Sequence, residues 1–344
     1  MTKTTLLVGS ALAAATFAGS AAARDTISIV GSSTVYPFAT VVAERFGKTS
    51  DFATPKIEST GSGGGIKLFC SGIGIDTPDI ANSSRRMKTS EFEQCQANGV
   101  TDITEVLIGY DGIAVANSVD ADQLELTTKE LYLALAKDVP NPDGTEELVP
   151  NPYTNWSDVN PDLPSAKIEV LGPPPTSGTR DAFVELVMEA GCEEYGFIEE
   201  MGESAMKAAC QTMREDGAYV EAGENDNLIV QKLEANPDAV GIFGFSFLDQ
   251  NSDKVQSSKI DGNEATFDAI ADGDYAVSRP LYFYVKGQHV GTVPGIDEYV
   301  AEFTSERAWG EDGYLADKGM IPLDDDLRDE IGSAARGMEK LQLN

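Results

Sequence analysis

The sequence predicts an α/β protein of two domains, with mostly parallel sheets and flanking helices. Strand-like and helix-like segments alternate along the chain, which is typical of parallel sheets covered by helices. The roughly 320 residues that follow an export signal exceed the usual size of one hydrophobic core, so two domains are expected. Four turns rich in Ser, Thr or Gly also stand where a strand-like segment gives way to a helix-like one.

Taken in order, the apolar and β-branched runs predict strands at 27–30, 56–58, 103–108, 112–116, 168–171, 240–243 and 281–285. Helical spacing predicts helices at 38–46, 65–71, 91–97, 127–136, 181–190, 227–234 and 324–338. Residues 140–164 are rich in Pro, Asn and Asp, so we expect a long surface loop or linker there.

The first 23 residues have the composition of a secretory signal peptide. Lys3 gives a basic start, residues 6–18 are mostly apolar, and small residues at 20–23 suit cleavage. The apolar stretch is too short to span a bilayer. We therefore expect a mature protein that begins at residue 24 and resides in the periplasm.

The chain is strongly acidic, with a formal net charge of −32. This charge argues against nucleic acid or an anionic membrane as a partner. It does not exclude a buried anion site, because surface charge is screened by salt within about 10 Å, and local dipoles and hydrogen bonds then decide.

The four turns indicate such an anion site. Residues 31–37 form a Gly/Ser turn before a helix opened by Pro37, and residues 60–67 repeat the pattern with a glycine run that lets backbone approach a ligand closely. Residues 79–86 are rich in hydroxyls, and Ser177, Gly178 and Thr179 stand at the start of a fourth helix, followed by Arg180. A helix start offers free N–H groups and partial positive charge, so four such turns fit one shared anion site better than four separate caps.

The four cysteines are even in number and belong to an exported chain, which indicates disulfides. Pairing of neighbours gives Cys70–Cys95 and Cys192–Cys210, one of three possible connectivities. Zinc is not expected, because there is no Cys-x-x-Cys pair and His289 is the only histidine.

The chain does not have the residues of a common hydrolase. A serine hydrolase needs a base beside its nucleophile, and this sequence has one histidine and no Gly-x-Ser-x-Gly elbow. It also has no His/Asp set for a metal-dependent phosphatase. We therefore expect a binding protein with no catalytic residues, no cofactor and no metal.

The ordered set of motifs resembles the periplasmic phosphate-binding proteins of ABC phosphate importers. The motifs are Gly-Ser-Ser-Thr-Val-Tyr-Pro at 31–37, Thr-Gly-Ser-Gly-Gly-Gly-Ile-Lys at 60–67, Asp-Ile-Ala-Asn-Ser-Ser-Arg at 79–85 and Thr-Ser-Gly-Thr-Arg at 176–180. The resemblance implies a type II periplasmic binding protein fold with the ligand in an interdomain cleft. It places a discontinuous domain 1 at 24–109 and 283–344 and domain 2 at 110–282, with crossings near 107–113 and 279–285.

The resemblance also implies a ligand, a partner and a set of contacts. The ligand would be inorganic phosphate, and the partner the membrane permease of an ABC importer, with the binding protein a monomer. Another tetrahedral oxyanion, such as sulfate or arsenate, or a role as a secreted phosphate sensor, are the alternatives. The implied contacts are Thr34 (with Ser33 as the register alternative), the Val35 amide, Ser62, Ser84, Ser177, the Gly178 amide and Thr179.

Two positions depart from the family pattern. Ser84 stands where many members have a carboxylate that accepts the proton of hydrogen phosphate, and Pro173 stands where many have an arginine. We expect Arg180 rather than Arg85 to supply the missing guanidinium. The missing acceptor could be Asp181, Asp226 or a backbone carbonyl near Ser84.

Overall fold

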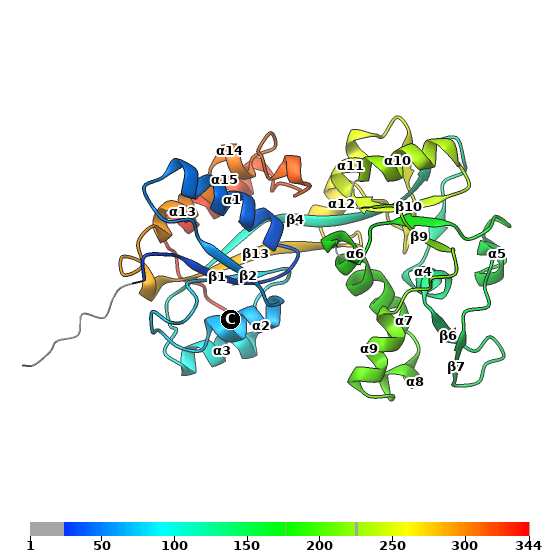
Figure 1. The fold of residues 1–344 in the computed structure, drawn as a ribbon, viewed down its shortest axis with the longest axis horizontal. Helices are drawn as coiled ribbons and strands as arrows, with labels where there is room; N and C mark the ends of the chain where they lie inside the picture. The colour runs from blue at the N-terminus through cyan, green and yellow to red at the C-terminus, as the bar shows by residue number, and fades with distance from the viewer. Residues whose placement is uncertain (1–23, 176, 224–225, 344) are drawn as a thin grey trace, which may run out of the picture.

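The protein is described here from a computed structural model that covers residues 24–343 apart from 176 and 224–225, so the predicted signal peptide lies outside the described residues. Figure 1 shows two groups of elements side by side, with strands β4 (Ile103–Ser118) and β13 (Ser278–Lys286) running between them. The predicted α/β class is confirmed. The division into domains at particular residues stays a prediction.

The first group is built on three parallel strands, in the order β2-β1-β3, and continues through antiparallel β13 and β4. Helices α1, α13, α14 and α15 cover one face of this sheet, and α2 and α3 cover the other (Figure 1). The bounds are β1 Ser28–Gly31, α1 Tyr36–Thr49, β2 Lys56–Ser59, α2 Ser62–Phe69, β3 Ile80–Ser83, α3 Thr89–Ala97, a 3-10 turn Gly287–His289, α13 Ile296–Phe303, α14 Glu306–Trp309, a 3-10 turn Ala316–Lys318 and α15 Asp325–Arg336.

The second group is built on parallel strands in the order β10-β8-β9, and β10 and β11 pair antiparallel with the far half of β4. One large apolar core fills it. The bounds are β5 Glu125–Leu126, α4 Thr128–Leu135, β6 Asp138–Pro140, β7 Leu148–Pro150, α5 Trp156–Val159, β8 Val170–Gly172, α6 Gly178–Phe183, α7 Ala190–Glu193, α8 Gly196–Glu199, α9 Glu203–Gln211, β9 Tyr219–Glu221, α10 Asp226–Ala235, β10 Val240–Gly244, α11 Phe245–Gln250, β11 Val255–Ser257, β12 Lys259–Ile260 and α12 Phe267–Ala271.

Strand β4 is continuous, so the prediction of two strands at 103–108 and 112–116 is wrong. The polar residues between them remain in the ladder, because Asp111 pairs with Arg279 of β13 and Tyr110 exchanges backbone hydrogen bonds of 2.8 and 2.9 Å with Ile321. Successive residues of a strand point to opposite faces. Asp111 thus faces Arg279, while a Cβ built on Gly112 would lie within 3 Å of side chains from α12 and from Ile321.

The helix predicted at 181–190 begins earlier and is not uniform. It starts at Gly178 as α6, continues as a π-helical segment at Val184–Glu189, and ends as α7. Wide π-turns are rare and are often found at functional sites. Its second residue is Glu185, whose carboxylate accepts a hydrogen bond from Arg279 of β13.

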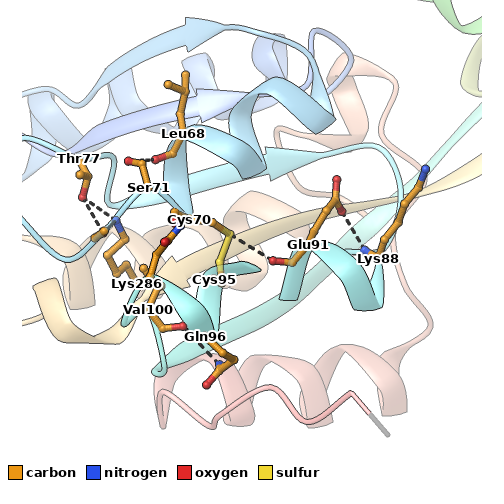
Figure 2. The surroundings of a disulfide bond; sticks show 12 residues. Leu68, Cys70, Ser71, Thr77, Lys88, Glu91, Cys95, Gln96, Val100 and Lys286 are labelled. Carbon is orange, nitrogen blue, oxygen red and sulfur yellow. Dashed lines mark hydrogen bonds between the residues drawn. A yellow bond between two sulfur atoms is a disulfide. The ribbon is translucent and has the colours of Figure 1, made fainter. Parts of the chain in front are cut away.

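Both predicted disulfides are confirmed. Cys70 pairs with Cys95, and Cys192 pairs with Cys210. Figure 2 shows how the first of these ties the end of α2 to α3, with the Cys70 sulfur 3.7 Å from the Glu91 carbonyl oxygen. Glu91 in turn accepts a hydrogen bond of 2.9 Å from the Lys88 amide, which caps the start of α3.

Residues 140–164 are not the plain loop that the sequence predicts. They contain β7 and α5, and Trp156 is buried with 1% of its surface exposed. The apolar anchor at Trp156 holds this segment on the core in spite of its prolines. No helix in the described part of the chain has the length and apolar character needed to cross a bilayer.

Candidate functional site

Three of the four predicted turns converge on one cavity of about 270 Å³. The turns come from the carboxyl ends of β1, β2 and β3, which are neighbours in the sheet, and this is where parallel α/β sheets bind ligands. The second group closes the cavity with two carboxylates, Asp181 of α6 and Glu185 of the π-helical segment that follows it. The lining residues are Ser32, Ser33, Thr34, Gly61, Ser62, Gly63, Ser84, Arg85, Asp181 and Glu185.

The first turn is shaped by Gly31. Its φ is +131°, and a Cβ there would lie 2.0 Å from the Asn82 carbonyl oxygen, so only glycine fits. The Ser32 hydroxyl then accepts hydrogen bonds from the amides of Thr34 (3.2 Å) and Val35 (3.3 Å). The Val35 amide is therefore hydrogen-bonded within the turn, whereas Ser33 and Thr34 line the cavity.

The second and third turns are joined by their serines. The Ser62 hydroxyl accepts the Ser84 amide at 3.1 Å, and the two hydroxyl oxygens are also 3.1 Å apart. Ser62 begins α2, after Gly61 at φ +72°, so the unpaired N–H groups of this helix start face the same space. Two predicted contact residues from separate parts of the chain are thus brought together.

Arg85 lines the cavity but is already paired. Its guanidinium makes a two-pronged contact with Glu91, at 2.7 and 2.9 Å. The hydrogen bond that Arg85 donates to Glu91 raises the pKa of Arg85 above its ordinary value. Burial works to raise the pKa of Glu91, but hydrogen bonds from Arg85 and the Lys88 amide outweigh it, and that pKa lies below its usual range.

Arg279 is the cation that the analysis of the sequence missed as a site residue. It is 6% exposed and lies on β13 between the two groups. Its guanidinium donates to the Thr34 hydroxyl and to the Glu185 carboxylate, and its Nε lies 3.4 Å from Asp111. Burial raises the pKa of Asp111, and Arg279 opposes that rise. The sequence signal that could have identified Arg279 as a site residue is an arginine near the start of a mainly apolar and aromatic strand.

The fourth turn lies beside the cavity and does not line it. Ser177 is the residue before α6 and makes no side-chain cap hydrogen bond among the described residues, while Thr176 lies outside them. Ser177, Gly178 and Thr179 are all half-buried. The first turn of α6 therefore keeps donors that its own helix does not use.

Arg180 lies in a second cavity of about 520 Å³, which shares Ser33, Asp181 and Glu185 with the first. Its guanidinium carbon is 4.4 Å from the centre of the Tyr219 ring, and its Nη1 is buried without a hydrogen-bond partner among the described residues. Stacking on an aromatic face holds an arginine in place without consuming its donors.

The three candidates for the acceptor of the ligand's proton differ in where the structure places them. Asp181 lines both cavities. Asp226 lines neither, and its carboxylate accepts the Gly244 amide at 3.2 Å, while burial raises its pKa to about 6. In the third turn, the Arg85 carbonyl accepts the Ser83 hydroxyl at 2.6 Å, which occupies one of its two lone pairs.

The fold and the site together define a class of protein, and comparison with known proteins agrees. A family model described as a PBP superfamily domain matches residues 16–307. The phosphate-binding protein PstS of Staphylococcus saprophyticus is 30% identical over 275 residues, which cover 78% of this chain and 73% of that protein. PstS of Staphylococcus haemolyticus is 30% identical over 294 residues, covering 83% and 79%. The chain therefore belongs to the PstS family of phosphate-binding proteins.

Two solved structures support the fold independently. The crystal structure of a possible phosphate binding protein from Planctomyces limnophilus superposes with a TM-score of 0.72 at 24% identity, covering 92% of this chain and 99% of the other. An ABC-type phosphate transport receptor from Vibrio cholerae gives 0.56 at 21% identity, covering 86% and 100%.

Proposed function

We propose that this protein binds one inorganic phosphate ion between its two groups of elements and delivers it to the permease of an ABC importer. The observation that carries the proposal is the convergence of three hydroxyl-rich turns on one cavity beside the buried Arg279. A desolvated anion needs many short hydrogen bonds and a fixed positive charge, which the hydroxyls of this cavity and the neighbouring Arg279 would supply.

The proposed contacts divide between the two groups. The Thr34, Ser62 and Ser84 hydroxyls and the helix starts behind them bind the anion from the first group. Ser33 and Arg85, at the rim, complete that wall. From the second group, Ser177, the Gly178 amide, Thr179 and Arg180 bind it when the cleft closes. The first turn of α6 has the unused donors that such a contact needs.

Arg279 adds positive charge to the proposed site, although it does not contact the ligand directly. It already holds the Thr34 hydroxyl, and it lies on a strand that joins the two groups. Its guanidinium also contacts Glu185 of the second group. Arg279 therefore links ligand binding in the first group to the position of the second group. Closure by a hinge at β4 and β13 is therefore part of the proposal.

The remaining expectations follow from the same proposal. The protein acts as a monomeric carrier in the periplasm after removal of residues 1–23, and it does not turn over its ligand. The alternatives, sulfate or arsenate binding or a role as a phosphate sensor, are not favoured, because the relatives at 30% identity are named phosphate-binding proteins.

Isothermal titration of the chain from residue 24 with phosphate, sulfate and arsenate tests the ligand. We expect one phosphate per chain and no release of phosphate from a chromogenic ester. Absence of binding heat with phosphate at several temperatures would contradict the proposal. Small-angle scattering with and without phosphate tests closure, and identical profiles would count against the hinge.

A further inference from the structure

A cavity of about 660 Å³ lies on the opposite side of strand β4 from the proposed phosphate site. Phe245 and Ile321 line this cavity, and a Cβ built on Gly112 of β4 would contact both of them. Asp111 precedes Gly112 and faces Arg279, which belongs to the phosphate site. Because successive residues of a strand point to opposite faces, β4 separates the two cavities. We call this second one the rear cavity.

Both groups of elements contribute walls to the rear cavity. From the second group come α11, β11 and the residues that open α12, and from the first group comes the segment at 311–322. A Cβ built on Gly319 would lie 3.4 Å from the Ser246 hydroxyl oxygen, so the two walls are close at this point. In Figure 1, α11 and α12 lie above β4, whereas α6, which contributes to the phosphate cavity, lies below it. The rear cavity thus spans the proposed hinge.

The floor of the rear cavity is apolar. The buried side chains that form it are Phe245, Leu248, Met320 and Ile321. Phe267, at the start of α12, lines the same space with 37% of its surface exposed. Cavities of about 300 to 1,000 Å³ with apolar walls are typical of small-molecule sites, and an aromatic face attracts organic cations.

Carboxylates surround this floor, and no basic side chain is among the residues that line the rear cavity. The five acidic residues are Asp249, Glu264, Glu311, Asp312 and Asp317. Within the described part of the chain, none of them forms an ion pair. A concave surface with charges of one sign concentrates ions of the opposite sign. The rear cavity therefore disfavours phosphate and favours a cation.

We propose that the rear cavity binds a small organic cation with an aromatic or aliphatic body and an ammonium group. The body covers the apolar floor, and the ammonium group lies between Phe267 and the carboxylates of the two walls. Burial of apolar surface and attraction between opposite charges act together on such a molecule. An inorganic cation lacks the first contribution, and an uncharged apolar molecule lacks the second.

The location of the rear cavity links this cation to the phosphate site, a step that rests on the proposed function and its hinge. Closing the cleft on the phosphate side of β4 moves the walls on the rear side apart. A cation that contacts both rear walls favours the arrangement in which they are close, whereas phosphate favours the closed cleft. The two ligands therefore oppose each other, and each weakens the binding of the other by the same factor.

The first test is calorimetry of the chain from residue 24 with phenylbutylammonium, at low fixed salt and without phosphate. The control ligands are the uncharged analogue phenylbutanol and the small cation methylammonium. We expect both controls to bind about 10-fold more weakly or worse. Equal binding of phenylbutanol, or no binding of phenylbutylammonium, would overturn the proposal. Binding of a Lys/Leu peptide in place of the amine would also overturn it, and would assign the cavity to a segment of a partner protein.

Two variants locate the binding site. Phe267→Ser removes the aromatic face, and Asp249→Asn/Asp317→Asn removes one carboxylate from each wall. The control Asp326→Asn/Asp329→Asn makes the same change of charge on α15, outside the cavity. All five side chains are exposed, so the substitutions leave the core intact. We expect the first two variants to lose about 5-fold or more in phenylbutylammonium affinity, and an equal loss in the control would overturn the proposal.

Phosphate titration with and without saturating phenylbutylammonium tests the link to the hinge. We expect phosphate affinity to fall about 5-fold or more when the amine is bound. In Phe267→Ser the same amine concentration should have little effect, while phosphate affinity without amine stays at the wild-type value. Phosphate affinity that is unchanged by bound amine would overturn the link. If phosphate does not bind at all, the proposed function fails, and the amine titration still decides whether the rear cavity is a cation site.

Discussion

Replacing Arg279 with glutamine tests whether a buried cation on the crossing strand supports the site. The substitution removes the guanidinium that holds the Thr34 hydroxyl and leaves Asp111, 14% exposed, without its partner. Unpairing a buried charge costs about 3 kcal/mol or more of folding stability. Loss of the charge and of the ordered Thr34 hydroxyl should weaken phosphate binding by about 10- to 100-fold. Thermal unfolding and calorimetry measure the two effects.

The stability loss in Arg279→Gln should depend on pH. Burial already raises the pKa of Asp111, and Arg279 is the group that lowers it. Without Arg279 the folded pKa rises further above the unfolded one. A carboxyl of that kind destabilises the fold when it is ionised, so the penalty is present at neutral pH and fades as pH falls through the raised pKa.

The double variant Arg279→Gln/Asp111→Asn is the control. It removes the unpaired carboxylate, so it should recover most of the lost stability without recovering phosphate affinity. Wild-type phosphate affinity in Arg279→Gln would refute the role given to this residue. A double variant as unstable as the single one would refute the account of its partner.

Three further predictions concern the turns and their support. Arg180→Gln should lose more phosphate affinity than Arg85→Gln, because Arg85 is neutralised by its own carboxylate partner; the reverse order in calorimetry would reassign the cation. Gly31→Ala should destabilise the protein by several kcal/mol or prevent folding, since a Cβ would lie 2.0 Å from a carbonyl oxygen; a melting temperature near that of the wild type would contradict this. Removing the Cys70–Cys95 bond by double serine substitution should cost about 3 kcal/mol in denaturant unfolding, and no loss would show that the bond does not constrain α2 and α3.

The turns of the first group could be predicted because their signals are local. Gly31 is required by its own backbone conformation, and Ser62 follows a glycine that permits the helix start. The order of strands and helices then brings such turns to one edge of a sheet. Sequence reasoning needs no long-range contact to reach this result.

Other features depend on contacts between distant parts of the chain. Arg279 meets Thr34 across 245 residues of sequence, so the residues around Arg279 cannot identify its partner. The Val35 amide donates to the Ser32 hydroxyl at 3.3 Å, a contact that the motif alone does not reveal, and its contact with the ligand stays a prediction. The π-helical segment that carries Glu185 depends on how that helix packs, which its sequence does not reveal.

A crystal structure of the protein grown with phosphate tests the central claim most directly. We predict one anion in contact with the Thr34, Ser62 and Ser84 hydroxyls and, at the same time, with the first turn of α6 at Ser177, Gly178 and Thr179. An anion bound away from these turns, or held by one group of elements while the other stays apart, would contradict the account.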